Sequence, residues 1–142
     1  MTPEQVDLVR AGMAQLSPHS DELAGAFYRR LFAARPDLRT MFPADLSAQR
    51  LKFAAELEAI VLAIPDFGSF VRRVRDLGAR HREYGVAAAH YAVVREALLG
   101  ALGERLGDAW TDDMEASWRQ AYDLVSETMM LGASGAEPTA RV

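Results

Sequence analysis

Apolar positions recur at steps of three and four along most of this chain, which places them on one face of a helix. The spacing predicts helices over residues 3–16, 20–35, 48–64 and 87–106. It predicts another helix that carries His81 and stops at Tyr84-Gly85, and a last one that begins after Thr111-Asp112-Asp113 and ends near Leu131. Residues 36–42 form a short helix or turn between two prolines. Because no segment alternates as a strand does, the prediction is an all-α fold with about six main helices around one core.

Local signals support some of these boundaries. Thr2, followed by Pro3 and by Gln5, has the pattern of a capping box, and Ser47 is expected to cap the third main helix. Residues 132–138 are small, polar and without periodicity. We therefore expect one domain over residues 1–133 and a flexible tail over residues 134–142.

Composition narrows the class of protein. A chain of 142 residues, half of them hydrophobic, suits one domain with a real core. Its net charge of −4 argues against nucleic acid, which requires a basic surface. The absence of cysteine excludes disulfides, zinc ribbons and iron–sulfur clusters. With no signal-like leader and no membrane-length apolar run, the expected location is the cytoplasm, without membrane contact.

His81 follows a regular inward stripe formed by Phe67, Phe70, Val71, Val74, Leu77 and Gly78. The imidazole is therefore expected to point inward, while the arginines of this segment fall on other faces. A buried polar ring needs a partner. Taken alone, an inward histidine is more often a hydrogen-bonded core residue than a metal ligand, so both interpretations stand at this point.

Other polar and aromatic side chains accompany predicted apolar faces. Tyr28 lies beside the stripe of the second helix, and Gln49 precedes Phe53 by four residues on the next main helix. Lys52 could lay its stem along an apolar wall with its ammonium at the rim. Phe42 has no helix left to pack within and is expected to plug a cavity. Each has an ordinary alternative as a core or surface residue, but together they suit a helical fold that holds a flat apolar cofactor.

Residues 3–131 resemble bacterial single-domain globins, which are related to the haem domain of flavohaemoglobins. Each matching motif is short and weak alone, while their order and spacing are specific. The motifs are Phe27-Tyr28 with Leu31-Phe32, Pro36 through Phe42, Gln49, Arg80-His81 with Tyr84-Gly85-Val86, Ala89-His90-Tyr91, Leu98-Leu99-Gly100-Ala101, and Trp118 with Ala121-Tyr122.

The resemblance implies a globin fold around haem b, that is, iron protoporphyrin IX. It makes His81 the proximal iron ligand and Tyr28 with Gln49 the distal polar pair. Phe42 would pack on the porphyrin, and Phe53 would line the distal wall. Dioxygen held in the pocket carries partial negative charge, so the phenol and the amide would each stabilise it by about 1–2 kcal/mol.

Two features depart from the flavohaemoglobin pattern. Tyr91 matches the tyrosine that supports the proximal histidine, but Ala133 stands where the family has a glutamate. Without that carboxylate, the imidazole donates less electron density, which weakens the case for enzymatic chemistry. The flavin and nicotinamide domains are also missing, so turnover with nitric oxide would need an external reductase.

The leading hypothesis is reversible binding of dioxygen, for storage, delivery or buffering, with carbon monoxide and nitric oxide as other possible ligands. The first alternative is a nitric oxide dioxygenase served by a separate reductase. A second is a haem-free, globin-like module for protein interaction. The loop from Phe42 to Gln49 is short, so direct approach of Tyr28, Gln49 or Lys52 to the iron also stays open.

Overall fold

The computed structural model describes residues 1–135 and is helical almost throughout. The main helices are α1 (Pro3–Leu16), α2 (Ser20–Ala34), α3 (Ser47–Ala63), α4 (Phe67–Glu83), α5 (Ala88–Leu106) and α6 (Asp112–Ser134). Short 3₁₀ turns η1 (Ser17–His19), η2 (Pro36–Met41) and η3 (Gly107–Ala109) join some of them. Residues 1–135 contain no strand, which confirms the all-α prediction.

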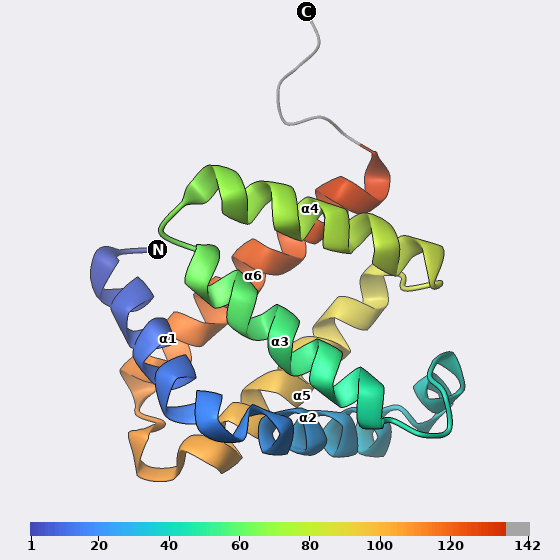
Figure 1. The fold of residues 1–142 in the computed structure, drawn as a ribbon, viewed down its shortest axis with the longest axis horizontal. Helices are drawn as coiled ribbons and strands as arrows, with labels where there is room; N and C mark the ends of the chain where they lie inside the picture. Colours follow the sequence, from blue (N-terminus) through green and yellow to red (C-terminus); the bar gives the residue numbers. More distant parts are fainter. Residues whose placement is uncertain (136–142) are drawn as a thin grey trace, which may run out of the picture.

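The helices cross in two layers (Figure 1). α4 lies along α6 at one end of the molecule, while α2 packs on α5 and on α3 at the other. α3 runs diagonally across the front between these two ends, and α1 packs against α6. The C-terminal part of α4 and the segment 36–46 therefore lie on the same side of the molecule, at the right of Figure 1.

The apolar interior is divided into two clusters. The larger joins α1, α2, α5 and the first half of α6, and includes Phe27, Tyr28 and Trp118. The smaller lies between α3, α4, α5 and α6 and is built from Ile60, Phe70, Val74, Tyr91 and Met129. An undivided core is the ordinary arrangement in a domain of this size. The division places the inward faces of α2 and α4 in separate clusters.

Two helix boundaries differ from the prediction. Ser47 is the first residue of α3 rather than its cap, and its backbone N–H donates to Asp45 Oδ1 at 2.9 Å. α6 continues to Ser134 and ends at Gly135, whose φ of 74° only glycine adopts readily. Gly132, Ala133 and Ser134, expected to be loose, are thus helical; residues 136–142 of the expected tail lie outside the described residues. The Thr2 capping box is confirmed.

α4 and α6 approach each other closely because two glycines face the neighbouring backbone. A Cβ atom on Gly78 would lie 1.9 Å from the carbonyl oxygen of Met129, and one on Gly132 would lie 2.0 Å from that of Arg75. These contacts hold the inward face of α4 in place. Phe67, the first residue of α4 and expected at the start of that face, is instead 62% exposed.

Candidate functional site

His81 lies in the last turn of α4, with its ring half-buried, as the stripe of apolar residues predicted. Its Nδ1 lies 2.8 Å from the carbonyl oxygen of Leu77, one turn earlier. A carbonyl oxygen can only accept, so Nδ1 carries the proton and the lone pair resides on Nε2. Burial lowers the pKa of His81 below its ordinary value, which keeps the ring neutral. The residue is therefore a fixed imidazole with its other nitrogen ready to bind a metal.

Tyr28 and Gln49 form a hydrogen-bonded pair between α2 and α3. The amide Nε2 of Gln49 donates to the phenol oxygen of Tyr28 at 3.0 Å. Tyr28 is buried, and this burial raises the pKa of its phenol, so the group is neutral at physiological pH. Because the phenol oxygen accepts the Gln49 bond, its own hydrogen is left to donate to a third group.

Aromatic rings surround this pair. Phe53 stacks on Phe27 with ring centroids 4.3 Å apart, and it meets the Tyr28 ring edge-on at 5.7 Å. Phe42 and Phe32 contact Tyr28 at 5.4 and 5.8 Å. Such packing fixes the orientation of the phenol and excludes water from it. The three residues expected on this side, Tyr28, Phe42 and Phe53, are thus brought together.

Arg39 shapes the loop that carries Phe42. Its guanidinium donates to the carbonyl oxygens of Pro43 at 2.8 Å and Ala44 at 2.7 Å. It also lies over the Phe32 ring, 5.3 Å from the centroid. One side chain therefore satisfies the carbonyls of a loop that has no helical partners, and it sets the position of Phe42.

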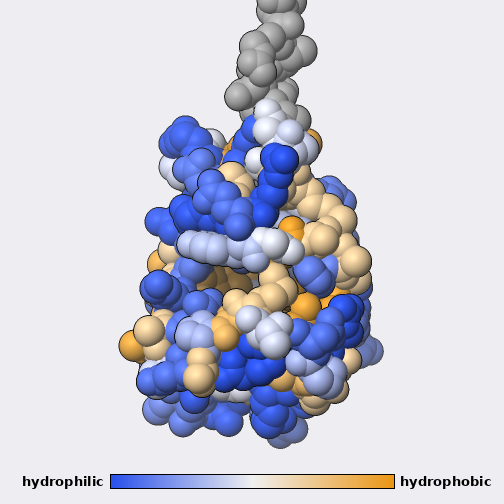
Figure 2. All heavy atoms as spheres, turned by 90° about the vertical axis from the view of Figure 1, so that its right-hand side faces the viewer, coloured by the Kyte–Doolittle hydropathy of each residue, from blue (hydrophilic) through white to orange (hydrophobic). Residues whose placement is uncertain are grey.

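The rim of the site lies on the face shown in Figure 2. Met41 at the end of η2 lies opposite Gly85, in the turn after α4. Lys52 is exposed on α3, and Tyr84 is 72% exposed beside the end of α4. Figure 2 shows a hollow on this face of the molecule, and the floor of the hollow is hydrophobic. Lys52 thus lies at the surface, where its ammonium remains solvated.

Tyr91 is buried in the smaller core cluster, on α5. Its backbone carbonyl accepts a hydrogen bond from the Tyr122 hydroxyl at 2.6 Å. Burial raises the pKa of both phenols.

Ala133 offers a backbone carbonyl only, which accepts from Arg82 at 2.9 Å. Nδ1 of His81 therefore bonds to a neutral carbonyl, the weaker of the two acceptor types known for such rings.

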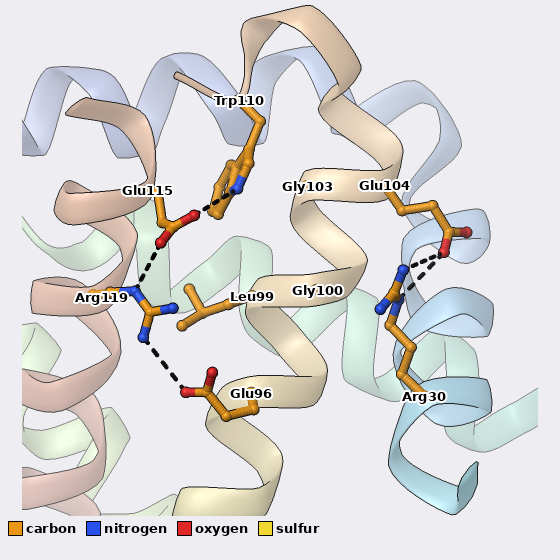
Figure 3. Close-up of a pocket in the computed structure, with 9 residues that line it drawn as sticks. All are labelled: Arg30, Glu96, Leu99, Gly100, Gly103, Glu104, Trp110, Glu115 and Arg119. Atoms are coloured by element: carbon orange, nitrogen blue, oxygen red, sulfur yellow. Dashed lines mark hydrogen bonds and ion pairs between the residues drawn. The ribbon is translucent and has the colours of Figure 1, made fainter. Parts of the chain in front are cut away.

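A polar groove of about 350 Å³ lies on the outer side of α5, away from these residues (Figure 3). Its floor includes Gly100 and Gly103. Its charged groups are already paired: Arg119 bridges Glu115 and Glu96, and Arg30 bonds to Glu104 on the other side of the helix. A groove whose arginines are both paired with glutamates favours a structural role in joining α2, α5 and α6.

Some of the groups that shape the site could not be predicted from the sequence. The Leu77 carbonyl and the loop contacts of Arg39 involve backbone atoms, which leave no signature in residue type. For Leu77 the spacing of four before His81 was an available signal, since a helical side chain reaches the carbonyl one turn back. Phe27 and Phe32 appeared only as parts of an apolar face.

Comparison with known proteins places the chain in a family. A model of the globin family matches residues 25–129. The flavohemoprotein of Deinococcus radiodurans is 34% identical over an alignment of 138 residues, and the match covers 92% of this chain and 33% of that protein. The flavohemoprotein of Bacillus subtilis is 27% identical over an alignment of 128 residues, and the match covers 88% of this chain and 32% of that one.

A solved structure gives the same result at the level of the fold. An engineered carbene transferase from Rhodothermus marinus, itself described as a candidate nitric oxide dioxygenase, superimposes with a TM-score of 0.85. The two chains are 28% identical, and the match covers 95% of this chain and 94% of the other. This chain belongs to the globin family.

Two further observations concern the length of the chain relative to its relatives and the character of its helices. The chain spans about a third of the length of the flavohemoproteins it matches. None of the helices in residues 1–135 has the length and apolar character needed to span a bilayer.

Proposed function

We propose that this globin binds haem b through Nε2 of His81 and uses the opposite side of the pocket to bind dioxygen reversibly. The observation that carries the proposal is the Nδ1 bond to Leu77, which fixes the tautomer that a metal ligand requires. Within residues 1–135, no three His, Asp or Glu side chains converge as a metal site. One histidine suits a metal that arrives with ligands of its own, as porphyrin iron does.

The chemistry of the pocket follows from its two sides. Haem supplies an iron atom with one open position for a diatomic ligand. On the distal side, Tyr28 would donate its free phenol hydrogen to a bound diatomic ligand, while Gln49 holds the phenol oxygen from behind. Phe42 and Phe53 keep the volume around the phenol apolar, and this strengthens each polar contact inside it. A polar ligand such as dioxygen gains more from this donor than carbon monoxide does.

Lys52 and Tyr91 have supporting places in this proposal. Lys52 is exposed on α3, and its ammonium would face the polar edge of the cofactor. Tyr91 is buried in the smaller core cluster and would contribute an apolar wall behind His81. Neither touches the distal pair.

Nitric oxide dioxygenation is the second candidate function, and it is favoured by the similarity to the Rhodothermus marinus protein. The proximal side argues against this function. The neutral carbonyl of Leu77 attracts the Nδ1 proton of His81 less strongly than a carboxylate would, so the imidazole donates less electron density. Reversible binding needs no strong electron donation through His81. It therefore fits the observed residues better.

Absorption spectroscopy of the purified protein, ferric and then dithionite-reduced, with and without carbon monoxide, tests the proposal. We expect a Soret band that shifts on reduction and sharpens with carbon monoxide. The variant His81→Ala should lose stable haem, while His19→Ala, a change at an exposed histidine of η1, should keep it. Equal haem retention in the two variants would show that His81 is not the ligand.

The two functions separate in a mixing experiment. Oxygenated protein mixed with nitric oxide and a cellular reductase should consume at most one equivalent if the protein is a dioxygen carrier. Sustained consumption would instead establish the dioxygenase.

A further inference from the structure

The exposed side of α4 is basic, although the chain as a whole is acidic. The helix carries five arginines against Asp76 and Glu83, a net charge of +3 in a chain of net charge −4. Four of the arginines, Arg72, Arg73, Arg80 and Arg82, are exposed, while Arg75 is half-buried. Figure 2 shows hydrophilic residues above the hollow, on the end of the molecule that α4 occupies, and below it. The helix that carries His81 therefore has more positive than negative side chains.

Ordinary structural roles account for only part of this charge. Arg80 and Arg82 lie in the last turn of α4, where cations stabilise the negative end of the helix dipole. Arg73 and Arg80 flank a polar groove and both bond to Glu56 of α3, at 2.5 and 3.4 Å. Asp76 lines the same groove, so two carboxylates, Glu56 and Asp76, stand against the guanidiniums of Arg73 and Arg80. The side chains of these two arginines nevertheless remain 47% and 52% exposed, so they still present charge to the solvent.

Arg72 has neither of these roles. It is exposed on the first half of α4, far from the helix C-terminus. Among the described contacts it donates a long hydrogen bond of 3.3 Å to Ser69, one turn earlier, and interacts electrostatically with Asp66. At the other end of the helix, Tyr84 is 72% exposed, two residues after Arg82. Arginine and tyrosine are the residues that most often anchor protein interfaces.

We propose that the exposed side of α4, from Arg72 to Tyr84, is a docking surface for the acidic face of a protein electron donor. The inference rests on the proposed function, because it needs a haem iron behind α4 to be reduced. His81 connects the two, since it belongs to the same helix. A donor seated on α4 would lie against the element that holds the iron, and complementary charge would steer it there.

The charge pattern favours a protein over other polyanions. Outside α4 the rest of the chain carries a net charge of −7, which would be repelled by an extended anionic surface such as a membrane or a nucleic acid. Asp76 and Glu83 also interrupt the basic side. Such an interrupted surface would be complemented by the acidic patch of a compact protein that also places a few basic residues opposite Asp76 and Glu83.

The test follows reduction of the ferric protein by reduced flavodoxin, a small acidic flavoprotein, in a stopped-flow instrument under carbon monoxide. The wild-type rate constant should fall at least about tenfold as ionic strength rises from about 20 to about 500 mM. Arg72→Glu should lower the low-salt rate about tenfold and flatten this dependence. Arg72→Lys keeps the charge and should retain the wild-type rate. Reduction by dithionite should be alike in all variants.

Arg10→Glu is the matched control, because Arg10 is exposed on α1 and the substitution changes the net charge equally. Equal slowing by Arg10→Glu and Arg72→Glu would overturn the docking surface and leave only a net-charge effect. A salt-independent wild-type rate would overturn it too.

Two further outcomes separate the proposals. Absence of a Soret band before the donor is added refutes haem binding and, with it, the docking surface. Binding to vesicles of phosphatidylcholine and phosphatidylglycerol that depends on Arg72, together with a flavodoxin rate that does not, assigns α4 to a lipid surface and overturns protein docking.

Discussion

At the scale of single residues, Gln49 supplies the hydrogen bond that the buried phenol oxygen of Tyr28 needs. A phenol inside an aromatic cluster would leave its oxygen without a partner, and the Gln49 amide supplies one at 3.0 Å. The arrangement also has a direction. Since the amide donates and the phenol oxygen accepts, the phenol hydrogen is the group available to a ligand in the pocket.

Tyr28→Phe removes that hydrogen and keeps the aromatic packing with Phe42 and Phe53. We expect haem to be retained and dioxygen to dissociate about 5–30 times faster, the equivalent of a bond of about 1–2 kcal/mol. Flash photolysis or stopped-flow displacement by carbon monoxide measures this rate. Tyr84→Phe, a matched change at an exposed tyrosine, should leave it unchanged. An unaltered rate in Tyr28→Phe would refute the donor role.

Arg39 gives a second prediction at this scale, because its guanidinium holds the loop that carries Phe42. Arg39→Lys keeps a charge but cannot reach both carbonyls in a planar fork. We expect haem to be lost to a haem-free acceptor protein several times faster, while the free energy of unfolding falls by only about 1 kcal/mol. Arg35→Lys is the control, since Arg35 pairs only with the exposed Asp37 among the described contacts. Equal haem loss in the two variants would contradict the role of Arg39.

The site was predictable where it depends on the faces of helices. The three-and-four spacing indicated that His81 points inward, and the model agrees. Gln49 was predicted on the face of Phe53, and it does meet Tyr28. The role assigned to each of these residues remains a prediction, since it comes from the resemblance. The Leu77 and Arg39 contacts were beyond sequence reasoning, because they are made to backbone atoms whose position only the fold determines.

At the scale of elements, the fold depends on how closely α4 lies on α6. Gly78 and Gly132 each face a backbone carbonyl of the other helix, so the two helices touch without intervening side chains. Close backbone contact leaves little freedom for α4 to shift. The position of His81, one turn after Gly78, is therefore set by the contact of α4 with α6, and α6 carries none of the predicted distal residues.

Gly78→Ala tests this contact. Its new Cβ would lie 1.9 Å from the Met129 oxygen, so α4 must move, and we expect the free energy of unfolding to fall by more than about 3 kcal/mol. Gly68→Ala in the same helix meets nothing nearer than 3.5 Å. There alanine should be neutral or stabilising by up to about 1 kcal/mol. Urea unfolding followed by circular dichroism compares them, and similar stabilities would show that the α4–α6 contact is loose.

Helix boundaries show where local signals fail. Thr2 and Gln5 cap α1 as predicted, because a capping box is complete within four residues. α6 passes through Gly132 and Ser134 despite their low helix propensity. The reason lies in the tertiary packing. A side chain at position 132 would clash with the backbone of Arg75 in α4, so the packing of α6 on α4 outweighs the cost of glycine in a helix, which is about 1 kcal/mol. The same argument explains why composition placed the end of the last helix too early, near Leu131.

At the scale of the whole molecule, buried tyrosines link stability to pH. Burial raises the pKa of Tyr28, Tyr91 and Tyr122 above the ordinary value near 10. The native state therefore keeps phenol protons that the unfolded chain loses at alkaline pH. Because the unfolded state then binds fewer protons, the free energy of unfolding is unaffected below pH 10 and falls as pH rises above it.

Tyr122 offers the sharpest test, because its hydroxyl donates to the Tyr91 carbonyl at 2.6 Å and burial dominates its raised pKa. Each such phenol makes the free energy of unfolding fall by up to about 1.4 kcal/mol per pH unit above pH 10. Tyr122→Phe should cost about 1 kcal/mol at pH 7, through the lost hydrogen bond. It should also decline less steeply than the wild type between pH 10 and 11.5, so that the two stability curves converge. Urea unfolding at a series of pH values measures both effects, and Tyr84→Phe, at an exposed ring, should follow the wild type throughout. A Tyr122→Phe curve parallel to the wild type would mean that Tyr122 loses its proton in the native state as readily as in the unfolded chain.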